Sequence, residues 1–259
     1  MATLIREATA LEYEDAGKGE PAVVLVHGIA CNRAFMAPQA RFLQTSHRVV
    51  AVDLRGHGDS DAPRQRYTIG ALADDVGWMC EQLDVGTAVV VGHSLGGHVA
   101  LELVAARPDL ARAAVLIDSA LLAGGGRESA VASPVAGLRG PDPGRVLNNY
   151  FRSFFGPYDD PAVCDWILEQ AARTPAHVTS SIWEESLRSW SDTRALAGCR
   201  VPLLYLDAGT PNADLGRAVR LNPALALGRT VGAGHFSQLI CHQQVNAMLE
   251  RFLAVGLQP

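Results

Sequence analysis

Short, almost continuously apolar runs recur along the chain and alternate with stretches of helical periodicity. The runs with the length of strands are residues 22–27, 49–53, 88–92, 113–118, 203–207 and 226–231. All but the last are apolar nearly throughout, which is typical of parallel strands covered by helices on both faces. Residues 67–83 and 95–107 have the periodicity of helices between such strands. The pattern predicts an α/β fold with a doubly wound, mostly parallel sheet.

Two segments depart from this alternation. Residues 3–15 alternate between apolar and polar side chains, which predicts an antiparallel hairpin at the sheet edge. Between about 121 and 196, glycine-rich and proline-rich turns precede helical stretches with many aromatic side chains: Tyr150, Phe151, Phe154, Phe155, Trp166, Trp183 and Trp190. These helices are either a packed surface pair or, as we favour, a lid that lines a pocket with apolar rings. The expected domains are a core of 1–120 and 197–259 and a helical cap of 121–196, inserted after the sixth strand.

Composition narrows the class of protein further. The chain has 259 residues, 48% of them hydrophobic and 19% charged, with a net charge of −5 and no basic block, so nucleic acid is not an expected partner. No apolar run approaches the roughly 18 residues that a membrane span needs, and the first residues lack the apolar core of a signal peptide. The five cysteines are scattered without zinc spacing, which favours free thiols in a reducing cytoplasm. We expect neither a metal nor a cofactor.

The segment around Ser94 carries the strongest chemical signal. An apolar run, residues 89–91, ends in Gly92-His93-Ser94-Leu95-Gly96, and a helical stretch begins at once. A Gly-x-Ser-x-Gly turn between strand and helix is typical of a nucleophile elbow, in which strained backbone projects the serine hydroxyl above the sheet. The helix start also presents free N–H groups to an anion that forms beside the serine.

Four motifs in a fixed order resemble the α/β-hydrolase superfamily, in its branch with a cap and a serine nucleophile. They are His27-Gly28, residues 53–60, residues 92–97 and residues 232–236. The resemblance implies that Ser94 is the nucleophile and that His235 is the base that takes its proton. It also implies an oxyanion hole made by the backbone N–H groups of Ile29 and Leu95.

The acid of the expected triad departs from the family pattern. Most relatives place it soon after the strand that corresponds to 203–207, but Pro211 and Asn212 occupy that position here. Some relatives carry the acid after the preceding strand instead, where this chain has Asp118. We therefore favour Asp118, with Asp214 as the first alternative, although Asp214 also suits a helix N-cap, and Asp207 as the second.

The resemblance implies a serine hydrolase that cleaves a carboxylic ester or lactone of a small to medium apolar substrate through an acyl-enzyme on Ser94. Serine at this position argues against dehalogenase and epoxide hydrolase chemistry, which in relatives uses an aspartate there. The alternatives are a C–C bond hydrolase or cofactor-free oxygenase of the aromatic-degradation type, and a non-catalytic small-molecule sensor. The expected partner is a small-molecule substrate, without nucleic acid or membrane, and a homodimer is left open.

Overall fold

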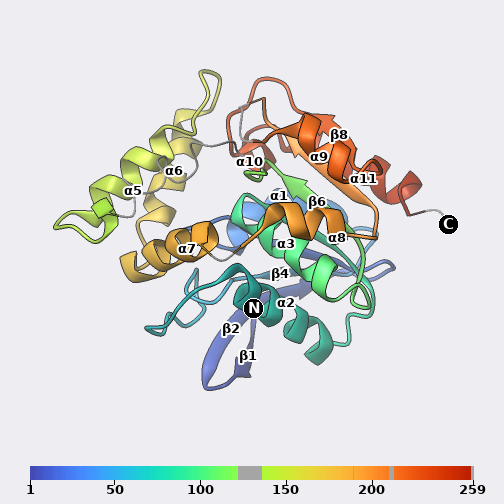
Figure 1. The fold of residues 1–259 in the computed structure, drawn as a ribbon, viewed down its shortest axis with the longest axis horizontal. Helices are drawn as coiled ribbons and strands as arrows, with labels where there is room; N and C mark the ends of the chain where they lie inside the picture. The colour runs from blue at the N-terminus through green and yellow to red at the C-terminus, as the bar shows by residue number, and fades with distance from the viewer. Residues whose placement is uncertain (122–135, 189, 210–212, 258–259) are drawn as a thin grey trace.

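A computed structural model describes residues 1–121, 136–188, 190–209 and 213–257. Its centre is a sheet of eight strands in the order β1-β2-β4-β3-β5-β6-β7-β8 (Figure 1). The strands are β1 (Ala2–Arg6), β2 (Thr9–Ala16), β3 (Val23–Val26), β4 (Val49–Val52), β5 (Ala88–His93), β6 (Ala111–Ile117), β7 (Leu203–Asp207) and β8 (Ala226–Arg229). Strands β1 and β2 form an antiparallel hairpin at one edge, β2 is antiparallel to β4, and all other pairs are parallel. The predicted sheet and its edge hairpin are confirmed.

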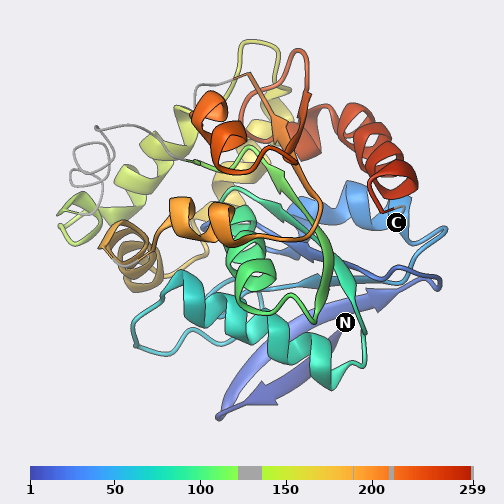
Figure 2. The ribbon, with the colours of Figure 1, turned by 45° about the vertical axis from the view of Figure 1, so that its right-hand side comes forward.

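Helices cover both faces of the sheet because the central strands are apolar on both. In β3, Val24 and Val26 pack into one hydrophobic cluster, and Val23 and Leu25 pack into another on the opposite face. The first cluster includes side chains of α2 (Ile69–Gln82) and α3 (Leu95–Ala106). The second includes side chains of α1 (Ala37–Leu43) and α11 (His242–Val255). Figure 2 shows these two helices close to each other. This two-sided burial, which is the main favourable contribution to folding, fixes the sheet as a rigid support.

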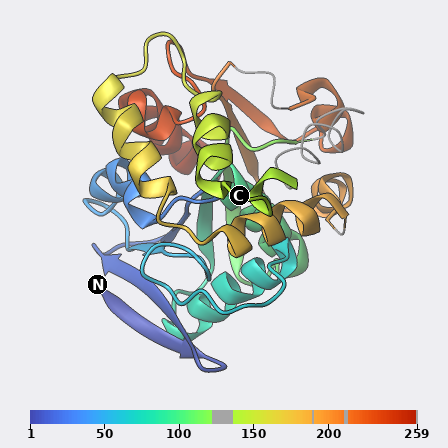
Figure 3. The ribbon, with the colours of Figure 1, turned by 90° about the vertical axis from the view of Figure 1, so that its left-hand side faces the viewer.

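In the described part of the chain, four complete helices lie between β6 and β7, and we call residues 136–198 the helical insertion. They are α5 (Pro143–Arg152), α6 (Pro161–Ala171), α7 (Ala176–Arg188) and α8 (Asp192–Gly198). Figure 3 shows α5, α6 and α7 on the side that faces the viewer. Helix α8 packs on α3 and crosses the predicted boundary at residue 196. A separate cap domain of residues 121–196 stays a prediction, and its glycine-rich start at 124–126 lies outside the described residues.

The last predicted strand, 226–231, is two residues too long. Thr230 still donates its backbone N–H to Asp207 of β7, but the N–H of Val231 donates to the Gln244 side chain of α11. The hydrogen bonds between β7 and β8 therefore end at Thr230, because the next backbone amide, that of Val231, binds a side chain. The remaining elements are η1 (Arg33–Met36), α9 (Leu215–Leu221) and α10 (Ser237–Ile240). Within the described ranges, no helix is long and apolar enough to span a membrane.

The order of the strands locates a crevice. Strand β3 lies between β4 and β5, so the connection after β3 leaves to one side and the connection that leads into β5 arrives on the other. At such a switch point the loops at the carboxyl ends of the strands part, and ligands bind between them. Ile29 follows β3 and Ser94 follows β5, so both lie at this point.

Candidate active site

Ser94 lies in a tight turn between β5 and α3. Its backbone has φ 53° and ψ −114°, which a residue with a side chain rarely adopts, and its N–H donates to the Ile117 carbonyl at 2.9 Å. A Cβ on Gly92 would lie 2.0 Å from the carbonyl oxygen of Gly96. A Cβ on Gly96 would in turn lie 2.2 Å from the Val26 carbonyl oxygen. The glycines of the motif are therefore required by close backbone contact, and the strained turn that the sequence predicts is present.

His235 and Asp118 meet although 117 residues separate them in sequence. The Nδ1–H of His235 donates to Oδ2 of Asp118 at 2.6 Å. Asp118 follows β6 with φ 44° and is fully buried, and its Oδ1 accepts the backbone N–H of Ala208 at 3.1 Å. The contact fixes which imidazole nitrogen carries the proton, and it leaves Nε2 as the basic nitrogen.

The two alternative acids are engaged elsewhere. Asp214 is the N-cap of α9 and accepts the backbone N–H of Arg217 at 2.9 Å. Asp207, at the end of β7, forms an ion pair with Arg229 at 3.1 Å. The geometry favours Asp118 as the partner of His235.

Ser94 and His235 line the same small cavity. Its lining is Gly28, Ile29, Cys31, His93, Ser94, Tyr150, Phe151, Phe154, His235 and Phe236. The cavity volume is about 20 Å³, which holds about one water molecule. Among the residues that the structure describes, the lining contains no lysine, arginine, aspartate or glutamate. Burial raises the pKa of Tyr150 to about 12, so its hydroxyl stays protonated at neutral pH.

Of the two residues whose backbone N–H groups are expected to form an oxyanion hole, Ile29 lines this cavity and Leu95 directly follows Ser94, which also lines it. Leu95 is the first residue of α3, and Ile29 lies in the loop after β3. In the part of the chain that the structure describes, neither of their N–H groups donates a hydrogen bond. Ala30 has φ 52°, so the loop that carries Ile29 is itself strained. Two free donors beside Ser94 are what an oxyanion requires.

Buried histidines brace the loops around Ser94. The Nε2–H of His93 donates to the backbone carbonyl of His235 at 3.0 Å. Burial, with a smaller contribution from nearby His235, lowers the pKa of His93 to about 3. His27 accepts the Leu54 N–H at Nε2, at 3.1 Å, and donates from Nδ1 to the Gly28 carbonyl; burial lowers its pKa to about 4. Both rings are neutral at pH 7, and their hydrogen bonds hold the loops around Ser94 in place.

The insertion supplies contacts that the sequence did not single out. The Phe154 ring stacks on the His235 imidazole, with ring centres 4.4 Å apart and planes at 30°. The carboxylate of Asp159 accepts the N–H of Gly234, directly before His235, at 3.0 Å. The aromatic composition of the insertion pointed to a ring-lined pocket, but nothing in the sequence distinguishes Asp159 from its neighbour Asp160, which caps α6.

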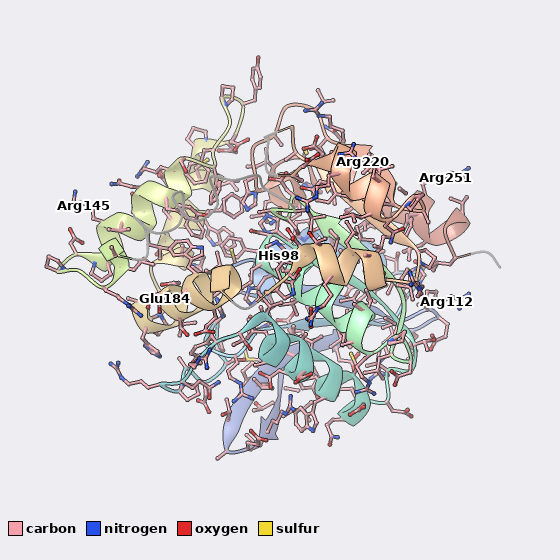
Figure 4. The ribbon with its side chains drawn as sticks, viewed as in Figure 1. His98, Arg112, Arg145, Glu184, Arg220 and Arg251 are labelled. Carbon is pink, nitrogen blue, oxygen red and sulfur yellow. The ribbon has the colours of Figure 1, made fainter. Side chains whose placement is uncertain are left out.

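His98 lies one turn into α3 and also serves a supporting role. Its Nε2 hydrogen bonds with the Ala120 carbonyl at 3.1 Å, and its ring packs against Trp190. Figure 4 shows it near the middle of the molecule. Among the described residues, no group of three or more His, Cys, Asp or Glu side chains is arranged to hold a metal ion.

Comparison with known proteins agrees with this architecture. The family model described as "alpha/beta hydrolase fold" matches residues 21–155, which is just over half of the chain. The chain therefore belongs to the α/β-hydrolase family.

Individual relatives are named hydrolases. The chain is 39% identical to the 2-(acetamidomethylene)succinate hydrolase of Mesorhizobium japonicum over 108 residues, which are 42% of this chain and 38% of the relative. The match thus spans little more than a third of that relative. Among solved structures, the fold is similar to a thermophilic esterase from Thermogutta terrifontis (TM-score 0.87, 22% identity, 99% of each chain). It is also similar to the enol-lactonase of Burkholderia xenovorans LB400 (TM-score 0.86, 22% identity, 98% and 100% of the two chains).

Proposed function

We propose that the protein is a serine hydrolase that cleaves a carboxylic ester or lactone of a small to medium apolar substrate. The observation that carries the proposal is that a strained serine and a carboxylate-paired histidine line one small cavity with several aromatic side chains. A serine hydroxyl is a weak nucleophile at neutral pH, and it needs a base within hydrogen-bond reach.

In the proposed reaction, Nε2 of His235 takes the hydroxyl proton of Ser94 as the oxygen attacks the substrate carbonyl. The N–H groups of Ile29 and Leu95 stabilise the oxyanion, and Asp118 stabilises the imidazolium. His235 then gives the proton to the leaving alkoxide, which releases the alcohol and leaves an acyl-enzyme. A water molecule, deprotonated by the same imidazole, hydrolyses the acyl-enzyme and restores Ser94.

The cavity supports an uncharged substrate. A carboxylate next to the scissile bond would lose its hydration without gaining a cationic partner from the described lining, which holds no arginine or lysine. Arg112, Arg145, Arg220 and Arg251 lie toward the outside of the molecule (Figure 4). The related enzyme named for a succinate derivative is therefore a guide to the fold and not to the substrate.

The test uses short p-nitrophenyl esters and a panel of simple lactones. The wild type should hydrolyse at least one of them, and Ser94→Ala should reduce kcat/KM by at least about 100-fold. Equal turnover by wild type and Ser94→Ala contradicts the proposal. If neither hydrolyses any ester, ring-cleavage products containing a vinylogous diketone, followed by loss of their absorbance, test the C–C hydrolase alternative. A ligand that raises the melting temperature without turnover supports the sensor alternative.

A further inference from the structure

His235 is held by the helical insertion as well as by the core. From the core, Asp118 binds its imidazole and His93 binds its backbone carbonyl. From the insertion, the carbonyl of Phe154 accepts the backbone N–H of His235 at 3.1 Å, and Phe154 stacks on the ring. The preceding amide, that of Gly234, binds Asp159. Two consecutive amides of the loop that carries the proposed base are thus bound to one corner of the insertion, residues 154–159, which we call the clamp.

Asp159 is the centre of the clamp. One carboxylate oxygen accepts the Gly234 N–H at 3.0 Å, and the other accepts the N–H of Gly156 at 2.9 Å. The residue is only 9% exposed, and no cation pairs with it in the described part of the chain. A buried carboxylate without a cation is costly unless hydrogen bonds compensate it. The start of α6 does not require it, because Asp160 provides that cap.

The clamp lies very close to the backbone of the loop that carries His235. A Cβ on Gly234 would lie 2.4 Å from the Phe154 carbonyl oxygen and 2.8 Å from the carboxylate of Asp159. A Cβ on Gly156 would lie 3.1 Å from the Gly234 nitrogen. Glycine at position 234 is what allows the carboxylate to bridge the two segments.

The clamp also reaches the cavity. Phe154 of the clamp lines it together with Tyr150 and Phe151 of α5, and the remaining volume of about 20 Å³ is too small for an acyl group. An ester can reach Ser94 only if part of this lining shifts, and the clamp belongs to the lining through Phe154. Because the clamp is hydrogen bonded to the loop of His235, a shift of the corner also moves the base.

We propose that Asp159 is a positioning residue, which orients His235 through Gly234 and so couples closure of the insertion over the substrate to alignment of the base. This inference rests on the proposed function. Loss of the clamp leaves the cavity able to admit substrate but leaves the imidazole without its insertion-side support. The effect therefore falls on kcat and not on KM, because a misplacement of about 1 Å at the reacting atoms costs up to about 100-fold in rate.

The experiment compares Asp159→Ala, Asp159→Asn and the matched control Asp160→Ala on the best p-nitrophenyl ester. Asp159→Ala should lower kcat about 10- to 100-fold with KM within about threefold, and Asp159→Asn, which keeps one acceptor oxygen, should lie between it and the wild type. Asp160→Ala removes only a helix cap, so it should lower the melting temperature and leave kcat within about twofold. The proposal is overturned if Asp159→Ala lowers kcat no more than Asp160→Ala does. If Asp159→Ala does not fold, the comparison of Asp159→Asn with Asp160→Ala decides.

A second readout does not depend on turnover. The proton shared between His235 and the buried carboxylate of Asp118 should give a low-field proton NMR signal, which Asp118→Asn assigns by removing it. We expect the signal to shift or broaden in Asp159→Ala and to stay unchanged in Asp160→Ala. An unchanged signal in folded Asp159→Ala overturns the proposal. If the wild type hydrolyses no ester, the proposed function fails, and this signal still tests whether Asp159 positions His235.

Discussion

Replacing Asp118 by asparagine tests the proposed triad most directly, because the two described contacts of the carboxylate constrain how the new amide lies. Oδ1 of Asp118 accepts the Ala208 N–H and Oδ2 accepts the His235 Nδ1–H. An asparagine has one acceptor oxygen, and the immobile backbone N–H of Ala208 selects it. The amide NH₂ then faces Nδ1 of His235, which must become an acceptor. The proton moves to Nε2, the nitrogen that should receive the proton of Ser94.

The magnitude follows from two losses. The imidazole is held in the tautomer that cannot act as a base, and the imidazolium of the transition state loses its negative partner. In serine hydrolase triads this change costs about 10⁴-fold in kcat, which corresponds to about 5.5 kcal/mol at about 1.4 kcal/mol per factor of ten. We expect Asp118→Asn to lose about 10³- to 10⁴-fold here. The melting temperature should change little, because the Ala208 hydrogen bond and the side-chain volume are retained.

The assay is the steady-state hydrolysis of a p-nitrophenyl ester, with circular dichroism melting to verify folding. Asp214→Asn and Asp207→Asn are the controls, and their kcat should stay within about threefold of the wild type. Asparagine at position 214 still caps α9. Asp207 forms an ion pair with Arg229 at the solvent-accessible surface, where such a pair contributes little. If Asp118→Asn keeps near-wild-type turnover and Asp214→Asn loses most of its turnover, the assignment of Asp118 as the triad acid is refuted.

Three other outcomes are expected. Phe154→Ala enlarges the cavity, so it should raise kcat/KM for p-nitrophenyl octanoate relative to that for p-nitrophenyl acetate by about tenfold. Any effect of the substitution on His235 lowers both values alike and cancels in the ratio. An unchanged ratio contradicts a role of Phe154 in limiting the size of the substrate. Gly92→Ala should lower the free energy of unfolding, measured in urea, by about 3 kcal/mol or more, because the added Cβ would clash with the Gly96 carbonyl. The control is Gly70→Ala in α2, where an added Cβ has no atom within 4 Å, and this change should raise the free energy of unfolding by about 0.5 to 1 kcal/mol. Burial lowers the pKa of His57 to about 3 in the folded protein, whereas in the unfolded chain this imidazole takes up a proton once the pH falls below about 6.5. The unfolded state therefore binds more protons as the pH falls, and the free energy of unfolding decreases. His57→Gln should therefore reduce the loss of unfolding free energy between pH 6.5 and 4.5 by about 2 to 3 kcal/mol, and an unchanged pH dependence of urea unfolding counts against a buried neutral His57.

Local pattern was sufficient for much of the fold. Strands with apolar side chains on both faces can be buried only between two layers of helices, so the runs at 22–27 and 88–92 predicted the parallel sheet. The elbow was equally readable, because only glycine tolerates the backbone contacts at residues 92 and 96. Ser94 and His235 followed from the motifs around them.

The sequence favoured Asp118 as the acid but left Asp214 and Asp207 open. Asp118, Asp207 and Asp214 all lie at or shortly after strand ends, and parallel strands bring such residues to the same edge of the sheet. Which carboxylate meets the imidazole of His235 depends on backbone direction after each strand. The positive φ of Asp118 turns its side chain toward His235, while Asp214 begins a helix.

The sequence by itself determined the layers of the protein and the strained serine, because both depend on the sizes and polarities of neighbouring residues. The tertiary structure alone decided the partner of His235, the size of the cavity and the clamp at Asp159. These features depend on contacts between segments 75 or more residues apart, such as Asp159 with Gly234. Packing of the whole chain sets such contacts, and no local periodicity encodes them.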